Sequence, residues 1–105
     1  MSNYKDLEVW KKSHKFALEI YKITDTFPKE EKYGIVSQLR RGSLSIPTNI
    51  VEGKGSTSTR KLSNFLDISR GSAQEVEYLL LFSKDLGYID QEKYNILEKE
   101  CISIL

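Results

Sequence analysis

Few residues of this sequence could carry chemistry, and none has the partners that catalysis requires. His14 is the only histidine and follows Trp10 by one helical turn, a position typical of a packed, hydrogen-bonded side chain. Cys101 is the only cysteine, so the chain has no internal disulfide, and the residue is typical of a small buried hydrophobe. One histidine and one cysteine do not supply the ligands of a structural zinc site.

Two further patterns are typical of enzymes only at first sight. Residues 53–57 read Gly-Lys-Gly-Ser-Thr, but they lack the Gly-x-x-x-x-Gly-Lys-Ser/Thr spacing of a phosphate-binding loop and follow no strand. Glu52, Glu75 and Glu77 could form a carboxylate cluster, but the Glu-x-x-His motif of di-iron bundles is absent. We therefore expect no enzyme activity, no cofactor and no small-molecule substrate.

The arginines are more informative, because an arginine near the interior of a helical bundle needs a carboxylate partner. One interpretation is a structural ion-pair network that fixes how the helices pack. The alternative is a phosphate-binding patch that forms when several subunits bring their arginines together. The residues expected in either network are Arg40, Arg41, Arg70, Glu52 and Glu77.

The net charge is +1, which argues against a dedicated, strongly basic nucleic-acid binder. The charges are nevertheless uneven: residues 38–70 contain six basic and two acidic residues, and residues 71–105 contain three basic and seven acidic ones. These segments could pair across a helix interface, or the basic residues could face outward and bind RNA. Beside a flexible Gly/Ser/Thr loop, the expected nucleic-acid contacts are Lys54, Arg60 and Lys61.

Apolar residues recur at helical spacing through the whole chain, and no segment shows the alternation of a strand. The pattern predicts one all-α domain, an up-down-up-down antiparallel four-helix bundle with helices at residues 6–26, 28–52, 58–86 and 90–105. The expected N-caps are Asp6, Ser58 or Thr57, and Asp90, and the expected terminating glycines are Gly53 and Gly87. Without a signal peptide or a membrane-spanning run, we expect a cytoplasmic protein with no membrane partner.

Two features of the first two helices indicate self-association. The first helix carries a second apolar stripe, which includes Trp10 and Tyr21 and is more than one bundle core requires. Pro47 interrupts the second helix, where proline costs roughly 3 kcal/mol. It either kinks a core helix or gives up local stability for a fit between helices or subunits. We therefore place Trp10, Tyr21 and Pro47 at an oligomer interface.

Several segments together resemble a known family. They are Leu-Glu-Val-Trp at 7–10, Phe-Pro-Lys-Glu-Glu at 27–31, Gln-Leu-Arg-Arg at 38–41, Ser-Ile-Pro-Thr-Asn-Ile-Val-Glu-Gly at 45–53, and Phe-Leu-Asp-Ile-Ser-Arg-Gly-Ser at 65–72. In these segments the chain resembles the four-helix-bundle proteins of the 23S rRNA intervening-sequence family. It departs from the family pattern at Gly42 and Val51, where alanine is usual.

The resemblance implies a four-helix bundle that assembles into a homopentameric ring. The chain is also similar to the accessory variability determinant of diversity-generating retroelements, which implies a reverse transcriptase and nucleic acid as partners. Two functions follow as expectations: a non-catalytic oligomeric module that binds RNA or a ribonucleoprotein partner, or a structural protein–protein scaffold that binds no nucleic acid.

Overall fold

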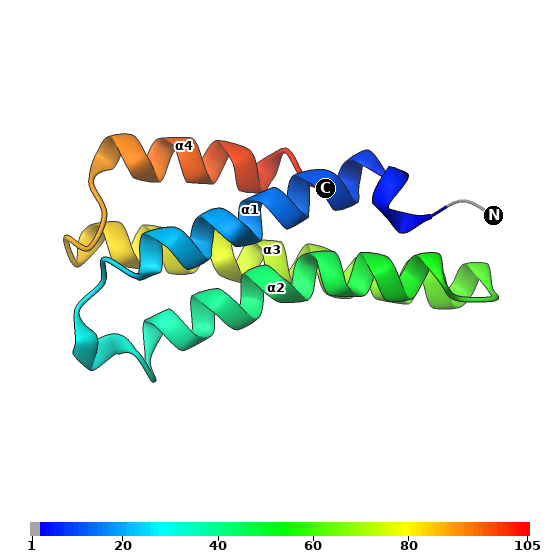
Figure 1. Cartoon of the computed structure of the whole chain (residues 1–105), viewed down its shortest axis with the longest axis horizontal. Coiled ribbons are helices and arrows are strands. Elements are labelled where there is room, and N and C mark those ends of the chain that lie inside the picture. Colours follow the sequence, from blue (N-terminus) through cyan, green and yellow to red (C-terminus); the bar gives the residue numbers. More distant parts are fainter. Residues whose placement is uncertain (1–2) are drawn as a thin grey trace.

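The computed structural model describes residues 3–105, and the fold in this range is an all-α, antiparallel four-helix bundle without strands (Figure 1). Consecutive helices run in opposite directions, so the predicted up-down-up-down architecture is confirmed. The helices are α1 (Glu8–Thr24), α2 (Ile35–Lys54), α3 (Thr59–Asp85) and α4 (Gln91–Ile102), with short 3-10 helices η1 (Tyr4–Asp6) and η2 (Lys29–Glu31).

The bundle is elongated, 44 × 24 × 18 Å, because α3 has 27 residues and a helix of that length spans about 40 Å. The most extensive packing joins α2 to α3, while α1 packs on α2 and α4 packs mainly on α3. No helix of residues 3–105 is long and apolar enough to cross a membrane. Buried apolar side chains from all four helices form the core: Phe16, Ile20, Leu39, Ile46, Ile50, Val76, Leu80 and Leu97.

The start of the first helix differs from the prediction. Asp6 is not its N-cap but lies in η1, and the capping position of α1 is Leu7, which makes no side-chain capping bond. Asn3 caps η1 instead, where its side-chain Oδ1 accepts a hydrogen bond from the Lys5 N–H at 3.0 Å. A local Asn cap starts a separate 3-10 turn here, so the α-helix begins two residues later than expected.

The second helix begins at Ile35 rather than at residue 28, so this boundary prediction was wrong. Pro28 starts only the short η2. Gly34, with φ −104° and ψ −117°, leaves helical geometry and separates η2 from α2. The Tyr88 hydroxyl donates to the Glu31 Oε2 at 2.7 Å, which ties η2 to the distant turn between α3 and α4.

Gly53 does not end the second helix in a left-handed conformation, as the sequence had indicated. The helix continues through it to Lys54, and Gly55 at the C-cap has a negative φ of −81°. Gly53 is buried because α3 approaches it: an added Cβ would lie 3.1 Å from the Leu62 Cδ1 and 3.2 Å from the Phe65 Cβ. The glycine at this position serves close helix packing rather than helix termination.

The expected caps of the third and fourth helices and the glycine after the third helix are confirmed, but the fourth helix ends at Ile102 rather than at residue 105, with Ser103 at its C-cap. The Ser58 Oγ accepts a hydrogen bond from the Lys61 N–H at 3.1 Å, and the Asp90 Oδ1 accepts one from the Lys93 N–H at 2.7 Å. Gly87 has a φ of +83°, a left-handed conformation that favours glycine, and it follows the end of α3 directly.

Pro47 lies inside α2 without ending it, and its neighbourhood is rich in side-chain hydrogen bonds. The Asn49 Nδ2 donates to the Ser45 carbonyl at 2.8 Å, and the Ser69 Oγ of α3 donates to the Ile46 carbonyl at 2.8 Å. Neither bond goes to the Ser43 carbonyl, which loses the donor that a Pro47 N–H would supply, so these bonds strengthen the neighbouring turn and its contact with α3 rather than replace the missing one.

A small residue allows α2 and α3 to approach each other closely at Gly42. An added Cβ at this glycine would lie 2.8 Å from the Val76 Cγ2 and 3.2 Å from the Glu75 Oε1. Gly71 is different, because a Cβ there would meet nothing within 4 Å. Only the first of these glycines is required by packing within the protomer.

We expect the same substitution to have opposite effects at these two glycines. Gly42→Ala should lower the free energy of unfolding by about 1 kcal/mol, because the clash with Val76 outweighs the better helix propensity. Gly71→Ala should raise it by about 1 kcal/mol through propensity alone. Urea denaturation of the two variants tests this, and a gain in stability for both would contradict the packing seen at Gly42.

Candidate functional site

The α2–α3 end of the bundle gathers three exposed basic side chains. Lys54 is the last residue of α2, and Arg60 and Lys61 lie in the first turn of α3, on either side of the loop at residues 55–58. Among the residues that the structure describes, none of the three forms an ion pair. The positive end of the α3 dipole lies in the same place. The arrangement suits a negatively charged ligand.

An open groove of about 500 Å³ lies beside this loop. Phe65 provides an apolar wall, Lys61 a cation and Glu52 the acidic counterpart. The lining combines hydroxyl, amide and lysine groups that can contact phosphate or sugar but offers no nucleophile paired with a base. Its residues are Glu52, Gly55, Ser56, Thr57, Lys61, Asn64 and Phe65.

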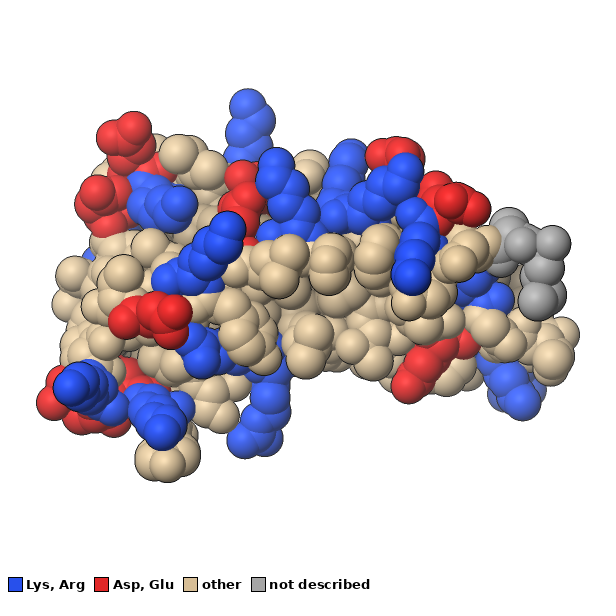
Figure 2. Space-filling model, in the orientation of Figure 1, with Lys and Arg blue, Asp and Glu red and all other residues tan. Residues whose placement is uncertain are grey.

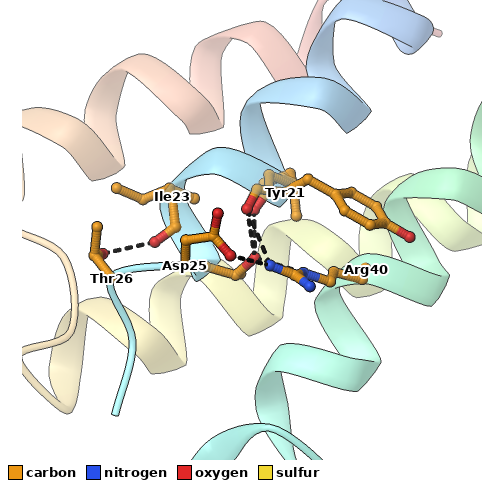
Figure 3. Close-up of polar contacts among 7 residues, drawn as sticks. Tyr21, Ile23, Asp25, Thr26 and Arg40 are labelled. Atoms are coloured by element: carbon orange, nitrogen blue, oxygen red, sulfur yellow. Dashed lines mark hydrogen bonds and ion pairs between the residues drawn. The ribbon is translucent and has the colours of Figure 1, made fainter. Parts of the chain in front are cut away.

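Arg40 has a different role from the predicted one, because its partners lie at the C-terminal end of α1 (Figure 3). Its Nε donates to the Thr24 Oγ1 at 2.9 Å, and one terminal nitrogen donates to the Tyr21 carbonyl at 3.1 Å and to the Asp25 Oδ1 at 2.8 Å. The guanidinium also lies 4.7 Å from the centre of the Tyr21 ring. Arg40 thus caps α1 from the neighbouring helix, and it is not paired with Glu52 or Glu77.

The rest of the predicted ion-pair network is wrong within the protomer. Arg70 pairs with Asp67 on its own helix at 3.5 Å, and both side chains are exposed. Arg41 is exposed and donates to the Ser37 Oγ at 3.3 Å. Arg70 was expected near the interior, but its side chain is exposed at the open edge between α3 and α4, where it lines a shallow pocket with Ala73 and Glu77 without pairing with Glu77.

The two glutamates of that network lie elsewhere. Glu52 lines the groove beside the loop, and Glu77 is half-buried where α3 meets α4, near Tyr94 and Cys101. Neither forms an ion pair in the described part of the chain. Helical periodicity correctly placed both glutamates on helices, but it could not show in which direction each side chain points.

Of the three residues expected at an oligomer interface, Pro47 is buried inside the protomer and is therefore removed from that group. Tyr21 is exposed beneath the Arg40 guanidinium. Trp10 is half-buried and stacks on His14, with ring centres 4.7 Å apart. His14 itself is exposed, so its ring is packed on one side rather than enclosed.

Cys101 is a buried thiol, as its sequence position indicated. Its Sγ donates to the Ala73 carbonyl at 3.3 Å. Burial, with Glu77 and Glu98 nearby, raises the pKa of the thiol to about 12. The neutral form therefore persists at physiological pH, and the residue is not a nucleophile.

Sequence reasoning missed a carboxyl pair between α1 and α4. Burial and a contact with the Glu19 carboxyl raise the pKa of Glu100 to about 7, against the opposing effect of Lys15 and Lys93. Ionisation of Glu100 near neutral pH therefore weakens the contact between these helices. The two glutamates are far apart in sequence, so no local pattern could have revealed the pair.

The comparisons with known proteins agree with this architecture. The family model of the 23S rRNA-intervening sequence protein matches residues 5–105. A crystal structure from Bacteroides thetaiotaomicron, of a protein of unknown function from the S23 ribosomal protein family, is 29% identical, with a TM-score of 0.82. The match covers 91% of this chain and 90% of that one. None of the curated proteins matches. The chain belongs to the 23S rRNA-intervening sequence protein family.

Proposed function

We propose that the protein is a non-catalytic, homo-oligomeric module, a pentameric ring, that binds RNA through the basic residues at its α2–α3 end. The observation that carries the proposal is the group of Lys54, Arg60 and Lys61, exposed beside a hydroxyl-rich groove and without an ion pair among the described residues. The name of the family, which refers to an intervening sequence of 23S rRNA, supports RNA as the ligand.

Assembly is what makes so small a patch effective. Three cations on one protomer would bind RNA weakly. A ring repeats these cations, and once one protomer has bound an RNA strand, the neighbouring protomers bind the same strand as an intramolecular event. Each phosphate contact should contribute a slope of roughly −0.7 to the logarithmic salt dependence. Three contacts on one protomer therefore predict that affinity falls about 20-fold between about 50 mM and about 200 mM salt.

A mobility-shift titration with single-stranded RNA tests the proposal. Reversing the charge at Lys54, Arg60 and Lys61 together should abolish the shift at about 50 mM salt and leave the oligomer intact. The matched control reverses Lys12, Lys29 and Lys99, three exposed lysines of α1, η2 and α4, and so changes the net charge equally.

The control is needed because Figure 2 shows further basic side chains over α1 and α4, mixed with acidic ones. If that control loses RNA as completely as the loop variant, the binding surface lies elsewhere or the effect is one of net charge. If wild-type protein gives no shift even at about 50 mM salt, RNA binding is excluded and the scaffold function is the better account.

A further inference from the structure

The outer side of α3 carries an apolar stripe that nothing in the protomer covers. Its large members, Ile68, Tyr78, Phe82 and Leu86, are between 45% and 59% exposed. They recur at spacings of three and four residues with Gly71 and Glu75 between them, so they share one face of the helix. The buried residues of α3 lie on its opposite side. This α3 stripe is unusual for a helix whose core face is already filled.

A second uncovered apolar surface lies across α1 and α2. Arg40 of α2 contacts Tyr21 of α1, and the helices are antiparallel, so Leu44 lies one turn along α2 in the direction of Leu18. Leu18, Tyr21 and Leu44 are all exposed. They form the α1–α2 face, and Figure 2 shows an uncharged band running across this side of the molecule.

The charges around the two surfaces are complementary. Glu75 lies in the middle of the α3 stripe, on the side where its Oε1 approaches Gly42 of α2, and it is exposed and forms no ion pair with any described residue. At the edge of the α1–α2 face, Lys22 and Arg41 are exposed and equally without an ion pair in residues 3–105. An acidic centre on one apolar surface thus matches basic groups at the rim of the other.

We propose that the α3 stripe of one copy packs against the α1–α2 face of the next copy. This inference rests on the proposed function, which requires an oligomer, and it names the surfaces that meet. Because the two surfaces are different, the contact is head-to-tail, and each copy keeps one free surface of each kind until the assembly closes. The partner that covers each surface is a second copy of this chain, because one chain carries both the α3 stripe and the complementary α1–α2 face.

The first test compares two tyrosines. Tyr78→Ser removes an aromatic side chain from the α3 stripe and should weaken assembly about tenfold or more, measured as mass against concentration by light scattering. Tyr33→Ser is the matched control, since Tyr33 is 88% exposed and belongs to neither surface. Both side chains are exposed, so both variants should fold, and a thermal melt checks this.

The second test uses disulfide cross-linking of mixed variants. Leu44→Cys should cross-link when mixed with Ile68→Cys, Tyr78→Cys or Phe82→Cys, in at least one of the three mixtures, whereas each variant alone should remain uncross-linked. Cys101 is buried and contributes no background. Cross-linking of each variant with itself would indicate a two-fold contact and overturn the head-to-tail arrangement.

The possible failures are separable. If wild-type protein is a monomer at micromolar concentration, the proposed oligomeric function fails and this inference fails with it. If wild-type protein assembles but Tyr78→Ser dissociates it no more than Tyr33→Ser does, or no mixture cross-links, only the choice of surfaces is wrong. A charge swap gives the positive counterpart: Glu75→Lys should weaken assembly, and adding Lys22→Glu and Arg41→Glu should restore it.

Discussion

Replacing Arg40 by alanine should lower the free energy of unfolding by about 2 kcal/mol, although the residue is partly exposed. The Tyr21 carbonyl lies in the last turn of α1, where carbonyls lack backbone donors from the helix, and it accepts hydrogen bonds from Arg40 at 3.1 Å and from the Thr24 Oγ1 at 3.2 Å. The substitution also removes the donor to Thr24, which is buried, and the guanidinium that stacks on the Tyr21 ring. A cation at this helix end is favoured by the dipole as well.

The ion pair with Asp25 should account for little of that loss. The Asp25 side chain is 79% exposed, and exposed pairs contribute roughly 0–1 kcal/mol. Asp25→Asn should therefore cost less than about 0.5 kcal/mol, and so should Arg41→Ala, the matched control on the next residue. Arg40→Lys should recover only part of the stability, because lysine lacks the planar fork.

Urea denaturation of the four variants at one protomer concentration measures these differences. If Arg40→Ala and Arg41→Ala lower the free energy of unfolding equally, the capping interaction of Arg40 contributes nothing to stability. A loss for Asp25→Asn as large as that for Arg40→Ala would assign the stability to the ion pair instead.

Helical periodicity and capping chemistry were sufficient to predict the fold. The four helices, the Ser58 and Asp90 caps and the left-handed Gly87 follow from local rules that tertiary contacts do not override here. Gly53 shows the limit of such rules. A glycine can end a helix or admit a neighbouring one, and only the position of Leu62 and Phe65 decides between the two.

The candidate site was less predictable, because a charged residue's partner depends on which way its helix faces. Lys54, Arg60 and Lys61 could be placed together since they flank one loop. The partner of Arg40 could not be found, because it is set by the antiparallel packing of α1 on α2 rather than by any spacing within α2. The prediction that Arg40 pairs with Glu52 or Glu77 was therefore wrong.

Pro47→Ala should have the opposite effect to Arg40→Ala and raise the free energy of unfolding by about 1–2 kcal/mol. Proline inside a helix costs roughly 3 kcal/mol, since it removes one backbone hydrogen bond and clashes with the preceding turn. Part of this gain is lost because Pro47 is buried, and truncating its ring removes about two methylenes at roughly 0.8 kcal/mol each. The net effect is stabilising.

Pro28 is the natural control for this prediction, as it is the other proline of the chain. With φ −56° it begins η2 in a conformation that suits proline, so Pro28→Ala should lower stability by about 0.5–1 kcal/mol through the greater freedom of the unfolded chain. Thermal melts combined with light scattering separate stability from assembly. An unchanged oligomer with a more stable protomer would mean that Pro47 is merely tolerated in α2. A more stable protomer that no longer assembles would mean that Pro47 positions Leu44 and the rest of the α1–α2 face.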